Sequence, residues 1–213
     1  MRLLKFSMVV VILIFESCSA YLTSSENVSK VKKSYEKILV VGRSKDKIAR
    51  IKFENEVVAQ LNQKGVNAMA SSDIDGTKIL SDNLTENQTE ALRGELVSQG
   101  FDGVIITNLI NTEEYTDVIP GNSSTTYIPT RYGRFGRHIG FYPVSTWEPD
   151  QLQTGTKYIF ESTFYNIINK EGDNLEWVGR FELKNPSSID KIANNYAKEL
   201  VTVLTKESIR TNQ

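Results

Sequence analysis

The stretch that decides the fold is Phe101-Asp-Gly-Val-Ile-Ile-Thr-Asn-Leu-Ile-Asn111. Its apolar residues form a nearly continuous block: Val104, Ile105, Ile106, Leu109 and Ile110. A strand that is apolar on both faces belongs inside a sheet that is covered on both sides. We therefore predict a central strand here. Before it the pattern alternates between strand and helix, and after it the pattern is a hairpin followed by one helix.

Two shorter strands precede the central strand. Residues 38–42 read as a buried strand that ends at Gly42, and residues 66–70 read as a weaker strand. A helix separates each pair of consecutive strands, and such crossovers are right-handed. The three strands are therefore predicted to be parallel, with the first strand between the other two.

Apolar residues at helical spacing predict three helices. They cover residues 45–64, residues 85–99, and a segment that Ser187 caps and that runs from Ile189 to Leu204. Ser44 is predicted to cap the first helix, and Gly65 to end it in the left-handed conformation. Thr85 and Gln88 have the spacing of a capping box at the start of the second.

The fold class predicted from these elements is α/β. The element order is β-α-β-α-β-β-β-α in a single domain of two or three layers, residues 37–207. Its mixed sheet has three parallel strands first and two antiparallel strands last, over residues 158–168 and 175–183. Residues 120–150 show neither helical nor strand periodicity and are predicted to be a long loop.

Length and charge narrow the function classes. A chain of 213 residues suits one domain with a sizeable core. Its 25 basic and 26 acidic residues give a net charge of -1, which provides no reason to expect nucleic acid as a partner.

The first 18 residues have the layout of a secretory signal. Arg2 and Lys5 precede the apolar run 6–15, which is about half of the ~20 residues that a spanning helix needs. Two processing routes remain open. Either Cys18, the only cysteine, is acylated and becomes the new N-terminus, or an ordinary signal peptidase cuts after Ala20. Residues 19–36 are predicted to be a flexible tether, and residues 208–213 a tail.

Several segments carry a resemblance. Phe15-Glu-Ser-Cys18 resembles a bacterial lipoprotein box of the Bacteroidetes type. Residues 37–41, Gly100 with residues 102–107, the aromatic loop, and residues 177–181 followed by 186–190 look like those of small α/β envelope lipoproteins, similar in outline to the N-terminal domain of TolB. The resemblance implies a protein anchored by acyl chains such as palmitate, on the outer membrane and facing the periplasm, with an assembly or interaction role.

Two candidate catalytic features are weak. Asp73-Ile-Asp75-Gly-Thr77 spells the D-x-D-G-T of haloacid-dehalogenase-type phosphatases, in which two Asp side chains act with Mg²⁺. The residues before it are not strongly apolar, so a turn-rich loop is the prediction. His138 is the only histidine and has no second histidine or cysteine as a metal co-ligand. We predict no catalytic residue, metal or cofactor.

The loop 120–150 combines arginines with aromatic residues, a pairing that can hold phosphate, carboxylate or sugar surfaces. The predicted partner-binding residues are Arg131, Tyr132, Arg134, Phe135, Arg137, His138, Phe141 and Trp147. The partner would be an envelope protein, lipid headgroups or cell-wall polymer; alternatively, the loop packs on the sheet edge. The predicted function is a lipid-anchored, non-enzymatic envelope lipoprotein. The alternatives are a Mg²⁺-dependent phosphoesterase using Asp73 and Asp75, or a soluble secreted ligand-binding protein.

Overall fold

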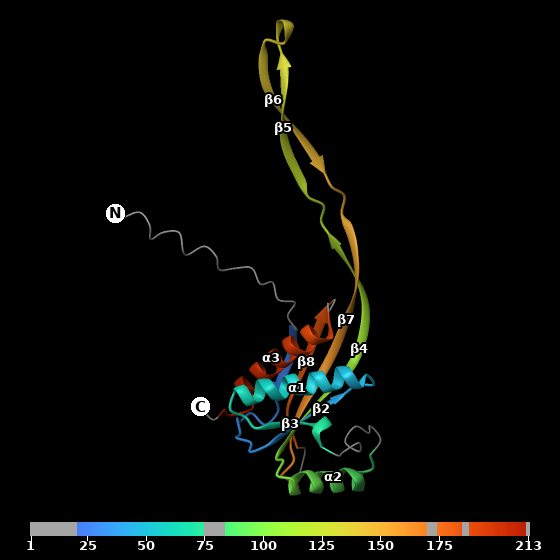
Figure 1. The fold of residues 1–213 in the computed structure, drawn as a ribbon, viewed down its shortest axis with the longest axis vertical. Helices are drawn as coiled ribbons and strands as arrows, with labels where there is room; N and C mark the ends of the chain where they lie inside the picture. The colour runs from blue at the N-terminus through green and yellow to red at the C-terminus, as the bar shows by residue number, and fades with distance from the viewer. Residues whose placement is uncertain (1–20, 75–83, 170–173, 185–187, 212–213) are drawn as a thin grey trace, which may run out of the picture. The chain divides into compact units, whose positions relative to one another are not determined.

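The computed structural model describes residues 21–74, 84–169, 174–184 and 188–211 (Figure 1). The chain divides into two compact units. We call Met1–Thr112 together with Tyr158–Gln213 the α/β unit, and Glu113–Lys157 the hairpin unit.

The strands are β1 (Tyr21–Asn27), β2 (Ile38–Arg43), β3 (Ala68–Ala70), β4 (Gly103–Ile119), β5 (Ser123–Tyr132), β6 (His138–Trp147), β7 (Gln151–Asn166) and β8 (Leu175–Lys184). The helices are α1 (Lys47–Gln63), α2 (Glu86–Ser98) and α3 (Ile189–Glu207), with short 3-10 turns η1 (Ser71–Asp73) and η3 (Arg134–Gly136). Six strands form one sheet in the order β1-β8-β7-β4-β2-β3, and β5 and β6 form a second sheet of two strands. The predicted α/β class is confirmed.

The α/β unit has three layers because its central strands are apolar on both faces. In β2, Ile38 and Val40 pack in the core that contains residues of α1 and α3. The alternate residues Leu39 and Val41 pack in a second core with Leu96 of α2. Successive side chains of a strand point to opposite faces, so α1 and α3 cover one face of the sheet and α2 covers the other (Figure 1).

The predicted arrangement of the parallel strands is confirmed. β2 pairs in parallel with β3 on one side and with β4 on the other. β4 and β7 are antiparallel. The Thr107 hydroxyl contacts the Ser162 hydroxyl, and the backbone carbonyl of Asp102 accepts a hydrogen bond from the amide of Ile167, so residues later along β7 pair with residues earlier along β4. β4 therefore lies inside the sheet, between β2 and β7.

The prediction of a tether over residues 19–36 is wrong from Tyr21 onward. Residues 21–27 form β1, an edge strand antiparallel to β8. Lys33 follows it and forms a 2.6 Å ion pair with Glu176, and the Tyr35 ring is buried against Phe164. The polar sequence of β1 lacks the apolar alternation of a strand, but β8 offers it an unpaired row of backbone donors and acceptors.

The predicted tail is also packed. The Lys33 amide donates to the carbonyl of Ser208, and the amide of Arg210 donates to the carbonyl of Lys33. Ile209 is fully buried in the main core. The chain after α3 thus pairs with the segment that follows β1, through a parallel bridge between Ile209 and Lys33.

The long loop predicted over residues 120–150 is a β-hairpin instead. β5 and β6 pair residue for residue from Ser123 with Trp147 to Tyr132 with His138. The order of elements along the chain therefore contains more strands than the predicted β-α-β-α-β-β-β-α. Glycines and prolines within residues 120–150 concealed the strand pattern, because both residue types usually indicate a loop.

The helix ends follow the predicted chemistry with two exceptions. The capping box of Thr85 with Gln88 and the left-handed Gly65 (φ 74°) are confirmed. Asp46, not Ser44, caps α1, and its carboxylate accepts from two amides of the first turn. Ser187 lies outside the described residues, and Ser188 is the residue that caps α3.

Some residues of the predicted apolar stripes are exposed. Ile48, which lies in the first turn of α1, is 65% exposed. The buried part of β4 ends near Thr107, so Leu109 and Ile110 are also exposed. The apolar block that predicted a central strand is thus longer than the part that the sheet covers.

Candidate functional site

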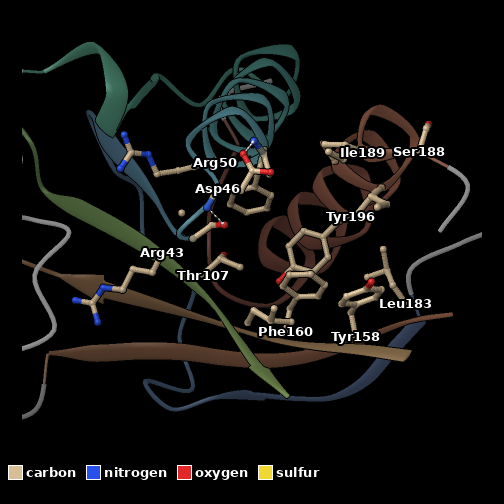
Figure 2. A pocket seen from close by; sticks show the side chains of 17 residues that line it. Arg43, Asp46, Arg50, Thr107, Tyr158, Phe160, Leu183, Ser188, Ile189 and Tyr196 are labelled. Carbon is tan, nitrogen blue, oxygen red and sulfur yellow. Dashed lines mark hydrogen bonds between the residues drawn. The ribbon is translucent and has the colours of Figure 1, made fainter. Parts of the chain in front are cut away.

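A cavity of about 470 Å³ opens in the α/β unit at the carboxyl end of β2, beside the part of β4 that carries Thr107 and Leu109. Ligands of open α/β sheets bind at such a position. Phe53, Tyr158, Phe160 and Ile192 give the cavity a mainly apolar wall. Figure 2 shows the rings of Tyr158, Phe160 and Tyr196 close to one another, and the ring centroids of Phe160 and Tyr196 are 5.3 Å apart. The wall is therefore suited to contact with apolar side chains of the protein or with an apolar group of a ligand.

The polar groups of the cavity are held by neighbouring protein groups. The Thr107 hydroxyl bonds to the Ser162 hydroxyl, which lies 3.0 Å from the Tyr196 hydroxyl. Burial raises the pKa of the Tyr196 hydroxyl well above its usual range. The guanidinium groups of Arg43 and Arg50 point away from the aromatic wall (Figure 2). These side chains thus do not converge on one point in the cavity.

A buried carboxylate lies close to the same end of β2. Glu54 is fully buried and accepts hydrogen bonds from the Gly42 amide (2.9 Å), the Ser71 hydroxyl (2.6 Å) and the Ser72 amide (3.0 Å). Arg50 Nε lies 4.0 Å from the same carboxylate. Glu54 therefore joins α1 to the end of β2 and to η1. Its sequence carries no signal of this role, because a glutamate inside a helix is normally exposed.

The predicted carboxylate pair is only partly described. Asp73 ends η1, directly after the short edge strand β3. Asp75 lies outside the described residues, as does Cys18. Within the described parts of the chain, no group of three or more His, Cys, Asp or Glu residues is arranged to hold a metal ion.

The hairpin unit holds all the predicted partner-binding residues. Arg131 and Tyr132 end β5, Arg134 and Phe135 lie in η3, and Arg137 precedes β6, which carries His138, Phe141 and Trp147. Each of these side chains is exposed. The structure thus brings the eight residues onto one hairpin.

Both faces of the two-stranded sheet carry large apolar side chains. The register and the alternation of strand residues place Tyr127, Ile139, Phe141 and Trp147 on one face. They place Ile128, Tyr132, Tyr142 and Val144 on the other face. All of them are exposed, and every residue of β5 is exposed. Only Tyr132, Phe141 and Trp147 of these apolar residues were among the predicted contact residues, because a loop was predicted here and not two alternating strands.

Two prolines modify the edges of this sheet. Tyr127 pairs with Pro143, and Pro129 pairs with Phe141. These two pairs are two positions apart along the strands, so they are pairs of the same kind, either both hydrogen-bonded or both not. Proline is accepted in a strand where the missing N–H would point away from the partner strand. Each outer edge of the hairpin therefore lacks a backbone donor near its middle.

The tip of the hairpin, which we define as residues 131–138, is a tight turn. Gly133 (φ 80°) and Gly136 (φ 65°) have left-handed backbones, and the Gly136 amide donates to the Gly133 carbonyl at 3.1 Å. Phe135 between them is also left-handed (φ 59°), which is uncommon for a bulky residue. Its side chain is 88% exposed, the highest value among the large apolar residues described.

Comparison with known proteins gives a distant likeness. No protein-family model and no curated protein matches the chain. Among solved structures, it is similar to a PelC dodecamer from Paraburkholderia phytofirmans (9% identity, TM-score 0.45), over 92% of this chain and 99% of that one. It is also similar to the lipoprotein GNA1162 from Neisseria meningitidis (14% identity, TM-score 0.40), over 81% of this chain and 99% of that one. At these TM-scores the likeness carries no argument about function.

Among the described residues, the three α-helices are each too short or too polar to cross a membrane.

Proposed function

We propose that this chain is a non-enzymatic envelope lipoprotein, anchored through Cys18 to the outer membrane and facing the periplasm, that contacts an envelope partner through its hairpin unit. The anchor part is supported by sequence: Arg2 and Lys5 lead into an apolar run that ends just before Cys18. The contact part is supported by the surface of the hairpin.

One observation carries the proposal: large apolar side chains cover both faces of the β5–β6 sheet and remain exposed. Monomeric soluble proteins rarely expose contiguous apolar patches of more than a few hundred Å². An isolated two-stranded hairpin is also only marginally stable in water. A strand pair of this composition is therefore suited to a bound state, in which a partner covers its aromatic rings.

The polar contacts within the hairpin unit support this view, because they hold the strands together without covering the rings. Ser124 bonds to Thr146 at 2.8 Å, and Gly121 donates to the Asp150 carboxylate at 2.8 Å. Added bulk at Gly121 has no space, since a Cβ there would lie 1.7 Å from the carbonyl oxygen of Glu148. The base of the hairpin is thus closely packed, and its apolar surface is the part left for contact.

Site-directed crosslinking in intact cells tests the contact. Photo-crosslinking residues at Tyr127 and Phe141, which lie on one face, are expected to trap the same envelope component. An equivalent residue at the exposed Lys198 of α3 is the matched control and is expected to trap nothing in common with them. If neither hairpin position yields a reproducible product, the hairpin unit is not the contact element.

Mass spectrometry of the native N-terminus tests the anchor. A diacylglyceryl mass on Cys18 is the expected result. A chain that begins at Tyr21 without lipid contradicts the anchor and favours a secreted protein. The non-enzymatic part fails if purified protein hydrolyses a phosphoester with Mg²⁺ and loses that activity in Asp73→Asn.

A further inference from the structure

We infer that the tip of the hairpin, residues 131–138, docks onto the headgroup layer of an anionic lipid bilayer. This inference rests on the proposed function, in which the hairpin unit is the contact element, and it names the partner of its tip. It depends on the charge of the tip, on the exposure of Phe135, and on the way in which apolar side chains surround the sheet behind it.

The tip is a local excess of positive charge. Arg131, Arg134 and Arg137 lie within a few residues of one another, and no acidic residue occurs between Asp117 and Glu148. None of the ion pairs found among the described residues involves these three arginines. Arg131 makes a 3.5 Å contact from Nη1 to the Gly136 carbonyl, at the limit of a hydrogen bond. Their charges are thus available to an anionic surface.

Phe135 supplies the apolar part of the contact. It projects from the turn between Arg134 and Arg137 and has no covering side chain, since 88% of it is exposed. Its left-handed backbone keeps it at the apex, where Gly133 and Gly136 allow the chain to reverse. An aromatic ring flanked by arginines is typical of segments that bind at the boundary between headgroups and acyl chains.

The sheet behind the tip favours a lipid surface over a folded partner. Tyr127 and Phe141 lie on one face, and Ile128 and Tyr142 lie on the other. A folded partner that docks on the hairpin covers one face and leaves the other in water. Lipid headgroups surround an inserted tip and contact both faces at once.

The strand edges argue against a second copy of the chain as the partner. Pro129 and Pro143 each remove a donor from an outer edge of the hairpin. A strand added to either edge would meet that gap. The remaining edge donors and acceptors still need water, which the hydrocarbon core does not supply. The contact is therefore confined to the depth of the headgroups.

Vesicle binding tests this inference. The chain from Ser19 to Gln213 retains every described residue and lacks Cys18, so binding does not depend on an acyl anchor. It is expected to co-sediment with vesicles that contain phosphatidylglycerol, to bind vesicles of pure phosphatidylcholine far less, and to lose binding as salt is raised. Replacing Arg131, Arg134 and Arg137 together by Ser is expected to weaken binding by about 100-fold, at about fivefold for each arginine. Phe135→Ser is expected to weaken it by about tenfold.

A matched triple variant controls for net charge. Lys45, Lys64 and Lys198 are exposed on the α/β unit, and their joint replacement by Ser removes the same charge. It is expected to change binding by less than about threefold. A thermal melt like that of the wild type shows that each variant is folded.

The outcomes separate this inference from the proposed function. Absence of binding to anionic vesicles, or equal losses in the arginine and lysine variants, overturns the inference. If crosslinking from Tyr127 and Phe141 still traps a protein, the proposed function stands. A change of oligomeric state in the arginine or Phe135 variants, without an effect on vesicles, means that a second copy covers the tip and also overturns the inference.

Discussion

The two tryptophans of the chain show how differently its two units use the same residue type. Trp177 in β8 is fully buried, and its indole N–H donates to Glu207 at 2.7 Å. Trp147 in β6 is 81% exposed. Both lie in antiparallel strands. An apolar strand residue therefore indicates a core only where a third element covers the strand, as α3 does for β8.

The same contrast extends to whole strands. In β2 the residues from Ile38 to Val41 are buried on both faces, whereas in β5 every residue is exposed. Helices cover the first strand on each side, and the described residues of the hairpin unit include no α-helix. We expect the contacts within the α/β unit to supply most of the free energy of unfolding. The exposed side chains of the hairpin unit are expected to contribute little to it.

The largest expected effect on the free energy of unfolding comes from replacing one of the two tryptophans, Trp177, by alanine. Trp177→Ala is expected to lower the free energy of unfolding by about 4 kcal/mol, because it removes a buried ring and leaves Glu207 without that donor. Trp147→Ala is the matched change in the hairpin unit and is expected to alter it by less than about 0.5 kcal/mol. Urea denaturation followed by circular dichroism measures both. Similar losses would mean that the hairpin has a core of its own.

A somewhat smaller effect is expected at Glu54. Glu54→Ala leaves the Gly42 and Ser72 amides and the Ser71 hydroxyl without their acceptor, and is expected to cost about 3 kcal/mol. Glu114→Ala removes an exposed carboxylate of the hairpin unit and is expected to change stability by less than about 0.5 kcal/mol. The same denaturation experiment compares them. Equal stability of the two variants would show that Glu54 does not join α1 to β2 and η1.

Alkaline pH tests the buried hydroxyl of Tyr196. Because burial raises its pKa in the folded protein, this tyrosine stays neutral at a pH where the unfolded chain ionises, near 10. Its contribution to stability is therefore complete below about pH 10 and is lost as the pH rises further. Between pH 10 and 11 it is expected to lower the free energy of unfolding by about 1 kcal/mol, a loss that Tyr196→Phe lacks. Parallel pH curves for wild type and variant would contradict this.

The smallest effect is expected when the hairpin unit is removed. The pairs Asp102 with Ile167 and Thr107 with Ser162 give a register that places Thr112 opposite Lys157, so Asn-Gly can join these two residues in place of residues 113–156. The shortened chain is expected to keep its free energy of unfolding within about 1 kcal/mol, since loop length alters closure entropy only slowly. It is also expected to lose the crosslinks of the hairpin. Failure to fold would show that the two units depend on each other.

Much of the α/β unit was predictable because its local signals agree with its packing. The continuous apolar residues of β2 and β4 indicated strands covered on both faces, and the capping box at Thr85 marked the start of α2. In β8, the alternation of Trp177, Phe181 and Leu183 with exposed or half-buried residues is also found. Glu176 breaks that alternation, since it is buried, and its carboxylate forms an ion pair with Lys33.

The rest was hidden because tertiary contacts, not local pattern, decide it. β1 has a polar sequence and becomes a strand through its backbone pairing with β8 and through Ser25, which donates to Glu207. In the hairpin, Pro129 and Pro143 are signals of a loop, yet the strands accept both at outward positions. The eight predicted contact residues lie on that hairpin, and their role stays a prediction.

The position at which β1 begins sets a distance. Tyr21 is three residues after Cys18, and three extended residues reach at most about 11 Å. If Cys18 is acylated, Tyr21, the first residue of the outer strand, lies within roughly one headgroup layer of the bilayer surface. Such a short standoff confines the protein to a thin shell along the membrane, so that it searches for its partner in two dimensions and meets only components that come close to the lipid.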